Sequence, residues 1–192
     1  TLRPVKDVGP QMRAPRPGLL LLLLLGLVAA AGWRCVDAPF LLDDVDQMAH
    51  VRTFSGISDC FGPDAYGLVR PIKNLLFHAV ARTGPHAVQA ARAVSLVLAL
   101  AAVCVVYRWF RLWFKSPYWS LAAAALWALA PTQVSCLAWF SCANILVCVL
   151  GVTGGLCLWD SARRAFERHR SRAGTRAAAA ALLAFAAAFF AY

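Results

Sequence analysis

Three aspartates in the stretch 40–46, Phe-Leu-Leu-Asp-Asp-Val-Asp, are the residues of this chain best suited to chemistry. A carboxylate can take a proton from a hydroxyl group, and its oxygens can bind a divalent cation. Asp43 and Asp44 are neighbours that point in different directions, so we expect one to act on a substrate and the other to support it. The alternative is structural, because either aspartate could be the N-cap of a short helix over 44–54.

Two basic residues further along the chain could hold a phosphate group. Arg70 and Lys73 flank Pro71, which is tolerated in the first turn of a helix. A guanidinium offers a planar fork of donors, an ammonium offers a point charge, and a helix N-terminus adds a favourable dipole. The alternative is that both side chains lie along a membrane surface with their charged ends in water.

Arg92 and His86 lie near the start of the second apolar run. A buried arginine in a membrane helix usually has a partner, so Arg92 is either a third phosphate ligand or a structural residue. His86 could face the same cavity, although a structural role suits it as well. The seven cysteines include no Cys-x-x-Cys pair and no metal-ligand spacing with histidine, so we predict no zinc site and leave open only a divalent cation at the aspartates.

The composition is that of a protein embedded in lipid. The chain is 61% hydrophobic and only 15% charged, with a mean hydropathy of +0.63, which leaves too little polar surface to cover a soluble core of this size. The apolar runs approach the length of about 20 residues that a membrane span needs. We therefore predict an all-α, polytopic transmembrane bundle over 18–192, with about five membrane helices at 18–33, 93–110, 118–140, 144–159 and 175–192.

The two ends and the first run allow further expectations. Met12 precedes two arginines and a leucine run and would be a natural start, whereas Tyr192 falls inside an unfinished apolar helix, so we expect the N-terminal part of a longer protein. The first run also has the composition of a secretory signal peptide, which is the alternative to an uncleaved helix. Either way, the segment 34–88 is expected on the outer side.

The basic residues are distributed unevenly between the two sides of the predicted membrane. The tail 1–17 and the two links after the second and fourth runs hold 13 of the 19 lysines and arginines, while the opposite side is neutral. The positive-inside rule then places the N-terminus in the cytoplasm and makes 34–88 an extracytoplasmic loop. Charges at these positions orient helices and meet anionic lipid, so we predict membrane lipid and no nucleic acid as a partner.

The outer loop is expected to contain secondary structure. A turn-rich connection over 56–67 separates the short helix over 44–54 from a second helix that begins at Pro71. The apolar residues of the second helix follow helical spacing and predict an amphipathic helix along the membrane surface (Ile72, Leu75, Leu76 and Val80). Cys35 and Cys60 share this loop and could form a disulfide. Within the third run, Pro131 predicts a kink or an early end of the span.

The order of these motifs is similar to that of a known family. A short first helix is followed by Phe-x-x-Asp-Asp at 40–44, Arg-Pro at 70–71, Gly-Pro-His at 84–86 and, after a basic turn, Ala-Pro-Thr at 130–132 and Ala-Trp-Phe-Ser at 138–141. Over roughly 18–159 the chain resembles the GT-C integral-membrane glycosyltransferases, particularly the branch of the protein O-mannosyltransferases and the transmembrane TPR-containing O-mannosyltransferases.

This resemblance implies an enzyme that moves a sugar from a polyprenyl- or dolichyl-phosphate carrier to a protein or glycan acceptor on the extracytoplasmic or lumenal side. It implies Asp43 as the catalytic base with Asp44 beside it, and Arg70, Lys73, Arg92 and His86 around the lipid phosphate. The membrane would be a bacterial inner membrane or that of the endoplasmic reticulum. Five helices seldom enclose two substrates, so we expect the 192-residue piece alone to be inactive.

Two other classes of function compete with the transferase. A transporter fragment or a scaffold with an outer loop would need no lipid-linked sugar, and a GT-C-like pseudoenzyme would bind a lipid or a partner without transferring anything. The third and fourth runs carry no ionisable side chain other than cysteine and tyrosine, which argues against an ion pathway but not against a scaffold.

Overall fold

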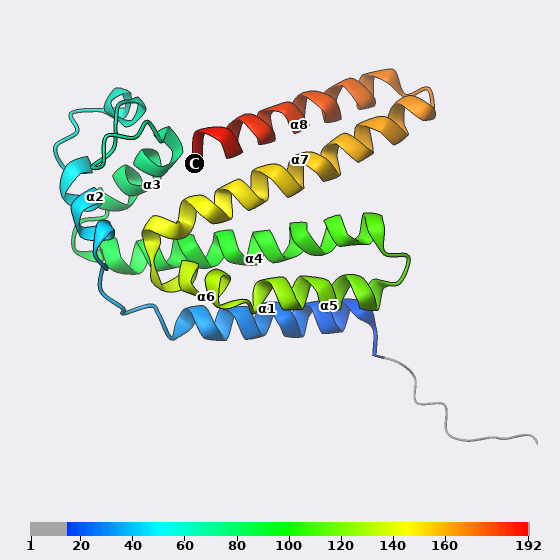
Figure 1. Cartoon of the computed structure of the whole chain (residues 1–192), viewed down its shortest axis with the longest axis horizontal. Helices are drawn as coiled ribbons and strands as arrows, with labels where there is room; N and C mark the ends of the chain where they lie inside the picture. The colour runs from blue at the N-terminus through cyan, green and yellow to red at the C-terminus, as the bar shows by residue number, and fades with distance from the viewer. Residues whose placement is uncertain (1–14, 192) are drawn as a thin grey trace, which may run out of the picture.

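The computed structural model describes residues 15–191, and within that range it is helical and has no strand (Figure 1). The predicted tail 1–17 and the candidate start at Met12 therefore fall largely outside the described residues. The helices are α1 (Pro17–Trp33), α2 (Asp43–Val51), η1 (Ile57–Phe61), α3 (Pro71–Ala81), η2 (Gly84–His86), α4 (Ala87–Trp113), α5 (Pro117–Ala128), α6 (Pro131–Ala138), η3 (Phe140–Cys142), α7 (Ala143–Glu167) and α8 (Ser171–Ala191).

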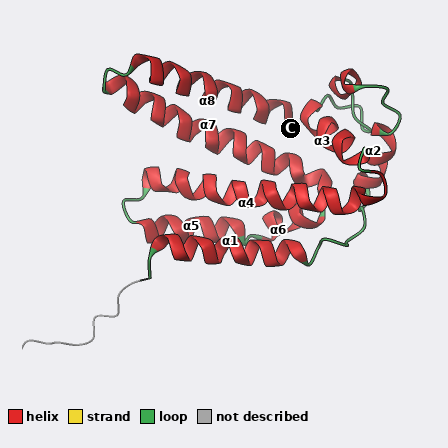
Figure 2. Ribbon diagram, turned by 180° about the vertical axis from the view of Figure 1, so that it is seen from behind, coloured by secondary structure: helices red, strands yellow, loops and turns green. Residues whose placement is uncertain are grey.

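Long apolar helices lie roughly side by side and connect two opposite ends of the molecule (Figures 1 and 2). Three helical segments are long and apolar enough to cross a membrane, namely 84–113, 140–167 and 171–191, and a fourth span results if α5 and α6 count as one broken helix. The described chain thus has the character of a membrane protein. The predicted first span is α1, which is apolar but only 17 residues long, so the number of spans lies at three or four by length and composition.

Two of the predicted runs were drawn too short. α4 covers 27 residues, because it begins six residues before the predicted run and ends three residues after it. α7 covers 25 residues, because it continues through the polar residues 160–167. At about 1.5 Å per residue, both are long enough for the roughly 30 Å of a bilayer core. The fourth predicted run, 144–159, therefore belongs to a helix long enough to span a membrane.

The predicted kink at Pro131 is confirmed. α5 ends at Ala128, α6 begins at Pro131, and the two helices meet at 56°. Proline has no N–H to donate to the preceding turn and disfavours the helical conformation of the residue before it, and Ala130 is accordingly extended. This bend turns α6 and η3 toward the outer layer, where the candidate site lies.

The outer layer comprises residues 34–86 and packs on the end of the bundle where α1 ends and α4 begins (Figure 1). Its apolar core is contributed by α2, α3, the start of α4 and η3, and its buried members are Met48, Val51, Phe77, Val80, Ala87, Ala91, Phe140 and Ala143. The rings of Phe77 and Phe140 lie 4.7 Å apart, which joins the layer to the turn before α7. The arginine-rich links α4–α5 and α7–α8 lie at the opposite end, as the charge pattern predicted.

The helices of the outer layer begin close to the predicted positions. α3 begins at Pro71 as expected, and its buried residues are half polar (Lys73, Asn74 and His78) and half apolar (Pro71, Phe77 and Val80), while Ile72, Leu75 and Leu76 are only partly covered. Apolar side chains that stay partly exposed suit the predicted helix along a membrane surface, which stays a prediction. The preceding segment supplies a carboxylate near Lys73 and carbonyl groups to Asn74, so these two polar side chains pack inward.

Candidate functional site

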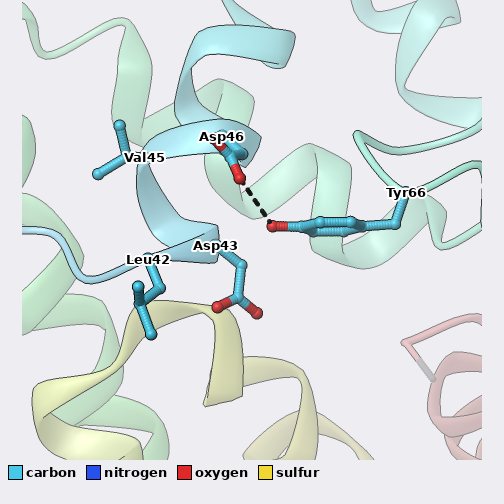
Figure 3. A pocket seen from close by; sticks show the side chains of 5 residues that line it. All are labelled: Leu42, Asp43, Val45, Asp46 and Tyr66. Carbon is cyan, nitrogen blue, oxygen red and sulfur yellow. Dashed lines mark hydrogen bonds between the residues drawn. The ribbon is translucent and has the colours of Figure 1, made fainter.

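Asp43 lines an open hollow at the surface of the outer layer. The hollow has a volume of about 570 Å³ and is lined by Leu42, Asp43, Val45, Asp46 and Tyr66 (Figure 3). The phenol of Tyr66 donates a hydrogen bond of 3.3 Å to the Asp46 carboxylate, which places the aromatic ring across from the first turn of α2. Among residues 15–191, no group donates a hydrogen bond to the Asp43 carboxylate, so its oxygens remain available to a ligand.

Asp44 has the opposite environment. It is fully buried, and its carboxylate accepts hydrogen bonds from the backbone N–H groups of Phe140 at 3.1 Å and Ser141 at 2.6 Å. These bonds join α2 to the turn between α6 and α7, nearly a hundred residues further along the chain. We expected one aspartate to act on a substrate and the other to support it. The structure holds Asp44 in the interior and leaves Asp43 in the hollow, an arrangement compatible with that prediction.

The capping alternative for the two aspartates is wrong. Leu42 is the N-cap of α2, Asp43 and Asp44 are the first two helical residues, and no side chain caps the helix end. Leu42 has a φ of 37°, in a region that side chains with a Cβ rarely adopt. The backbone is held there because Asp44 is drawn toward Phe140 and Ser141, and this tertiary contact outweighs the local preference for a capping carboxylate.

Asp64 is the charged residue that sequence reasoning missed. Its carboxylate accepts hydrogen bonds from the N–H groups of Tyr66 and Leu68, at 2.9 and 3.0 Å, and from the Arg70 guanidinium, whose Nε lies at 2.7 Å. Arg70 also forms a second, shorter contact through Nη2. The ammonium of Lys73 lies 3.9 Å from the same carboxylate. Asp64 thus binds both residues that were predicted to hold a phosphate.

A sequence signal for this role did exist. Asp64 and Gly67 occupy the first and last positions of a four-residue turn, a pattern typical of tight turns. The structure has that turn, with the Gly67 N–H donating to the Asp64 carbonyl at 2.9 Å and Gly67 at a φ of 78°. The pattern predicted the turn but not the ion pairs, because these depend on where α3 lies.

The pKa values of this cluster follow from burial and charge. Burial raises the pKa of Asp64, but the N–H groups of Tyr66 and Leu68 and the guanidinium of Arg70 outweigh that effect and leave it below its usual range. Burial and the nearby Arg70 charge lower the pKa of Lys73, while Asp64, Asp43 and Asp44 act in the opposite direction. Lys73 therefore lies within electrostatic reach of both candidate aspartates.

Arg92 is buried and forms the link between α4 and the start of the outer layer. Its guanidinium donates to the carbonyl of Ala38 at 2.9 and 3.2 Å and to that of Pro39 at 2.6 Å, and it lies 5.9 Å from the ring of Phe40. The expected partner of the buried arginine is therefore the backbone, four and five residues before Asp43. This contact positions the segment that leads to Asp43.

An amide network connects α2, α3 and η1 below the hollow. The Gln47 amide donates to the Asn74 side-chain oxygen at 2.9 Å, and the Asn74 amide donates to the carbonyls of Cys60 and Gly62, both at 3.1 Å. Both side chains are fully buried. Because each polar group has a partner, the network fixes the distance between α2 and α3 rather than weakening the layer.

The predicted site residues are only partly brought together. Asp43 and Asp44 lie on α2, Arg70 directly precedes α3 and Lys73 lies on α3 of the same layer, but of these four only Asp43 lines the hollow. His86 is exposed at the start of α4 and does not line it. Cys35 and Cys60 are free thiols. Within residues 15–191, no group of three or more histidine, cysteine, aspartate or glutamate side chains gathers as metal ligands. The roles assigned to these residues stay predictions.

Comparison with protein-family models, with curated proteins and with solved structures gave no match for this chain. The resemblance to GT-C glycosyltransferases therefore remains an expectation that depends on the motifs themselves.

Proposed function

We propose that the protein is, or is part of, a membrane glycosyltransferase that moves a sugar from a polyprenyl- or dolichyl-phosphate carrier to an acceptor hydroxyl. The observation that supports the proposal best is the contrast between adjacent carboxylates. Asp44 is buried and hydrogen-bonded to the backbone, while Asp43 lines a hollow and accepts no hydrogen bond from the described residues. A free carboxylate on a rigidly held backbone suits a general base.

In the proposed reaction, Asp43 takes the proton of the acceptor hydroxyl. The acceptor oxygen forms a bond to the anomeric carbon as the bond from that carbon to the carrier phosphate breaks, so the configuration inverts in one step. The phosphate leaves with the bonding electrons and needs nearby positive charge. A well-placed donor to such developing charge typically contributes about 3 kcal/mol.

The cluster of Arg70, Lys73 and Asp64 supports a role in holding that phosphate. Two cations share one carboxylate, which leaves one positive charge at the start of α3, where the Lys73 ammonium lies 5.6 Å from the ring of Tyr66, a residue that lines the hollow. The Arg70 side chain is still 16% exposed, so part of its guanidinium can reach a ligand while Asp64 holds the remainder in place. Such a pre-oriented arginine loses little side-chain entropy when it binds phosphate.

The test is transfer activity of the full-length protein in membranes that are supplied with a radiolabelled polyprenyl-phosphate sugar. Asp43→Asn keeps the shape of the side chain but removes the base, so transfer should fall by about a hundredfold or more while expression and insertion stay normal. Asp46→Asn is the matched control, because Asp46 lines the same hollow and carries the same charge, and it should keep most of the activity. Wild-type turnover by Asp43→Asn would remove Asp43 from the chemistry.

A non-enzymatic membrane protein is the second candidate, and one observation favours it. The Asp64 carboxylate already forms an ion pair with Arg70 and lies close to the Lys73 ammonium, so the outer layer can be stable without an anionic ligand. A scaffold or a pseudoenzyme would show no transfer from any lipid-linked sugar in the same assay. Asp43→Asn would then leave every measured property of the protein unchanged.

A further inference from the structure

The connection between α7 and α8 contains a basic hollow that belongs to neither the outer layer nor the proposed reaction. It has a volume of about 250 Å³ and is lined by Ser161, Arg164, Ala165, Arg168, Arg170 and Ala173. Three of these six residues are arginines, and they come from the last turns of α7 and from the connection itself. The α7–α8 connection that carries it lies at the end of the bundle opposite to the outer layer (Figure 2).

The carboxylates near this hollow are already paired. Asp160 accepts from Arg164 and, at 3.3 Å, from Arg163, and Glu167 accepts from Arg163 at 3.1 Å. Among residues 15–191, no carboxylate lies within salt-bridge distance of Arg168 or Arg170. Two guanidinium groups that line the hollow are therefore left without a counter-charge.

The end of α7 is closed by backbone hydrogen bonds. Its carbonyl groups disfavour negative charge, and those of Arg164, Ala165 and Phe166 accept hydrogen bonds from the N–H groups of residues 168–170, at 2.9 to 3.2 Å, so attraction of an anion depends on the guanidinium groups. The Phe166 ring packs on Gly174, where an added Cβ would approach the ring to 2.8 Å. This contact fixes the start of α8 against α7, so the arginines project from a rigid turn.

The position of the hollow suggests the source of the anion. Exposed tryptophans surround this end of the bundle on α4, α5 and α7 (Trp113, Trp119 and Trp159). Tryptophan is enriched at the level of the lipid headgroups. Basic hollows between membrane helices bind phosphate-bearing headgroups, and the charge pattern predicts that this end faces the cytoplasmic leaflet, which is rich in anionic lipid.

We propose that this hollow binds the phosphate of one anionic phospholipid headgroup, with Arg168 and Arg170 as the main ligands. Each guanidinium donates hydrogen bonds to phosphate oxygens, and Arg164 adds positive charge from its place beside Asp160. The proposal is independent of the transferase activity, since none of these residues lies near the outer layer.

The test is native mass spectrometry of the full chain in detergent micelles, with phosphatidylglycerol and phosphatidylcholine added at equal concentration. The wild-type protein should retain one phosphatidylglycerol and discriminate against phosphatidylcholine. Arg168→Gln with Arg170→Gln should weaken retention about thirtyfold, or about fivefold for each arginine. The matched control is Arg172→Gln with Arg176→Gln, which removes the same charge from exposed positions on α8 outside the hollow and should cost less than about fivefold.

A second pair of variants adds negative charge instead of removing positive charge. Ala173→Glu places a carboxylate among the arginines and should abolish retention, whereas Thr175→Glu adds the same charge to the same turn outside the hollow and should preserve it. Equal losses in the pocket and control variants would show diffuse charge attraction and overturn the proposal. Retention of soluble glycerol 3-phosphate in place of the lipid would also overturn it, because the site would then belong to a free phosphate compound.

Discussion

The outer layer and the contact between α7 and α8 bury opposite kinds of side chain. The layer buries Asp44, Gln47, Asp64, Lys73 and Asn74, none of which is more than 3% exposed. At the α7–α8 contact the closest approaches involve glycine and alanine, such as Gly151 against Ala184 and Ala188. The two regions thus illustrate two ways of holding helices together.

The difference has a physical cause. A buried polar group is stable only when it is hydrogen-bonded, and the outer layer provides such partners through its loops. Between two apolar helices in lipid no hydrophobic gain distinguishes a helix neighbour from a lipid neighbour, so close backbone approach and dispersion carry the association. The stability of the outer layer should therefore fall when a hydrogen-bond or ion-pair partner is removed. The stability of the hairpin formed by α7 and α8 should fall when a side chain at their contact is enlarged.

Cysteines allow the two regions to be followed separately. Cys60 is buried in the layer and Cys157 is buried on α7. Burial raises the pKa of Cys60, which further slows its reaction with thiol reagents while the layer is folded. Site-resolved labelling of the two thiols during heating, read by peptide mass spectrometry, reports on each region in one sample.

Removal of Asp64 should have the largest effect. Asp64→Ala leaves Arg70 and the buried Lys73 without their carboxylate, and breaking such a pair costs about 3 kcal/mol. We expect Cys60 to be labelled at a lower temperature, with little change at Cys157. Asp37→Ala is the control, because Asp37 is an exposed carboxylate of the same layer for which residues 15–191 provide no hydrogen bond or ion pair. Equal destabilisation by both variants would contradict a special role for Asp64.

Gly151→Ala should have the next largest effect, and it should act on the other region. The added Cβ would lie 2.5 Å from the Ala184 carbonyl oxygen and 2.7 Å from the Ala188 Cβ, so α8 must move, at a cost of about 2 kcal/mol. Gly154→Ala is the matched control, since its nearest neighbour is the Val105 side chain at 3.8 Å. Early labelling of Cys157 in the first variant only would support the comparison, whereas equal tolerance would contradict it.

Acid should weaken the layer before it affects the hairpin. The pKa of Asp64 is lower in the folded protein than in the unfolded chain, so the unfolded state binds more protons as the pH falls below about 4. The stability that Asp64 provides is present above that pH and is lost as the pH falls through its folded pKa. Cys60 labelling should accelerate at low pH after correction for reagent chemistry, and Asp64→Asn should reduce that dependence. An unchanged pH profile in the variant would assign the effect to other groups.

Loss of the Tyr66 hydroxyl should have the smallest effect. Tyr66→Phe removes one hydrogen bond of 3.3 Å at the surface, to Asp46, and such a bond contributes about 0.5 kcal/mol. Cys60 labelling should barely change. A loss as large as that of Asp64→Ala would mean that the hollow, rather than the buried cluster beneath it, holds the layer together.

Several features of the fold could be predicted because they depend on neighbouring residues alone. The start of α3 at Pro71 and the break at Pro131 both follow from the proline ring, which fixes one backbone angle and removes a donor. The apolar character of the runs follows from composition. Their ends were less predictable, since α4 and α7 continue through arginines that water and headgroups can solvate.

The candidate site was predictable in its residue types but not in its pairings. The Asp-Asp pair was found because acids so close to an apolar run are unusual, yet only the family resemblance, and no property of the residues themselves, distinguished the hollow-lining Asp43 from the buried Asp44. Likewise, the spacing of Arg70 and Lys73 predicted a phosphate ligand, while their actual partner Asp64 was assigned only to a turn. Which partner a charge finds depends on contacts between distant segments.

By itself, then, the amino-acid sequence determined a helical, lipid-compatible chain with its excess positive charge at one end and its aspartate motif at the other, because apolar runs and charge asymmetry act locally. The tertiary structure alone decided that the backbone of Phe140 and Ser141 binds one aspartate and leaves its neighbour in the hollow, and that Lys73 and Asn74 of α3 are buried. Both outcomes arise from hydrogen bonds between segments far apart in the chain, whose geometry exists only once the helices have packed.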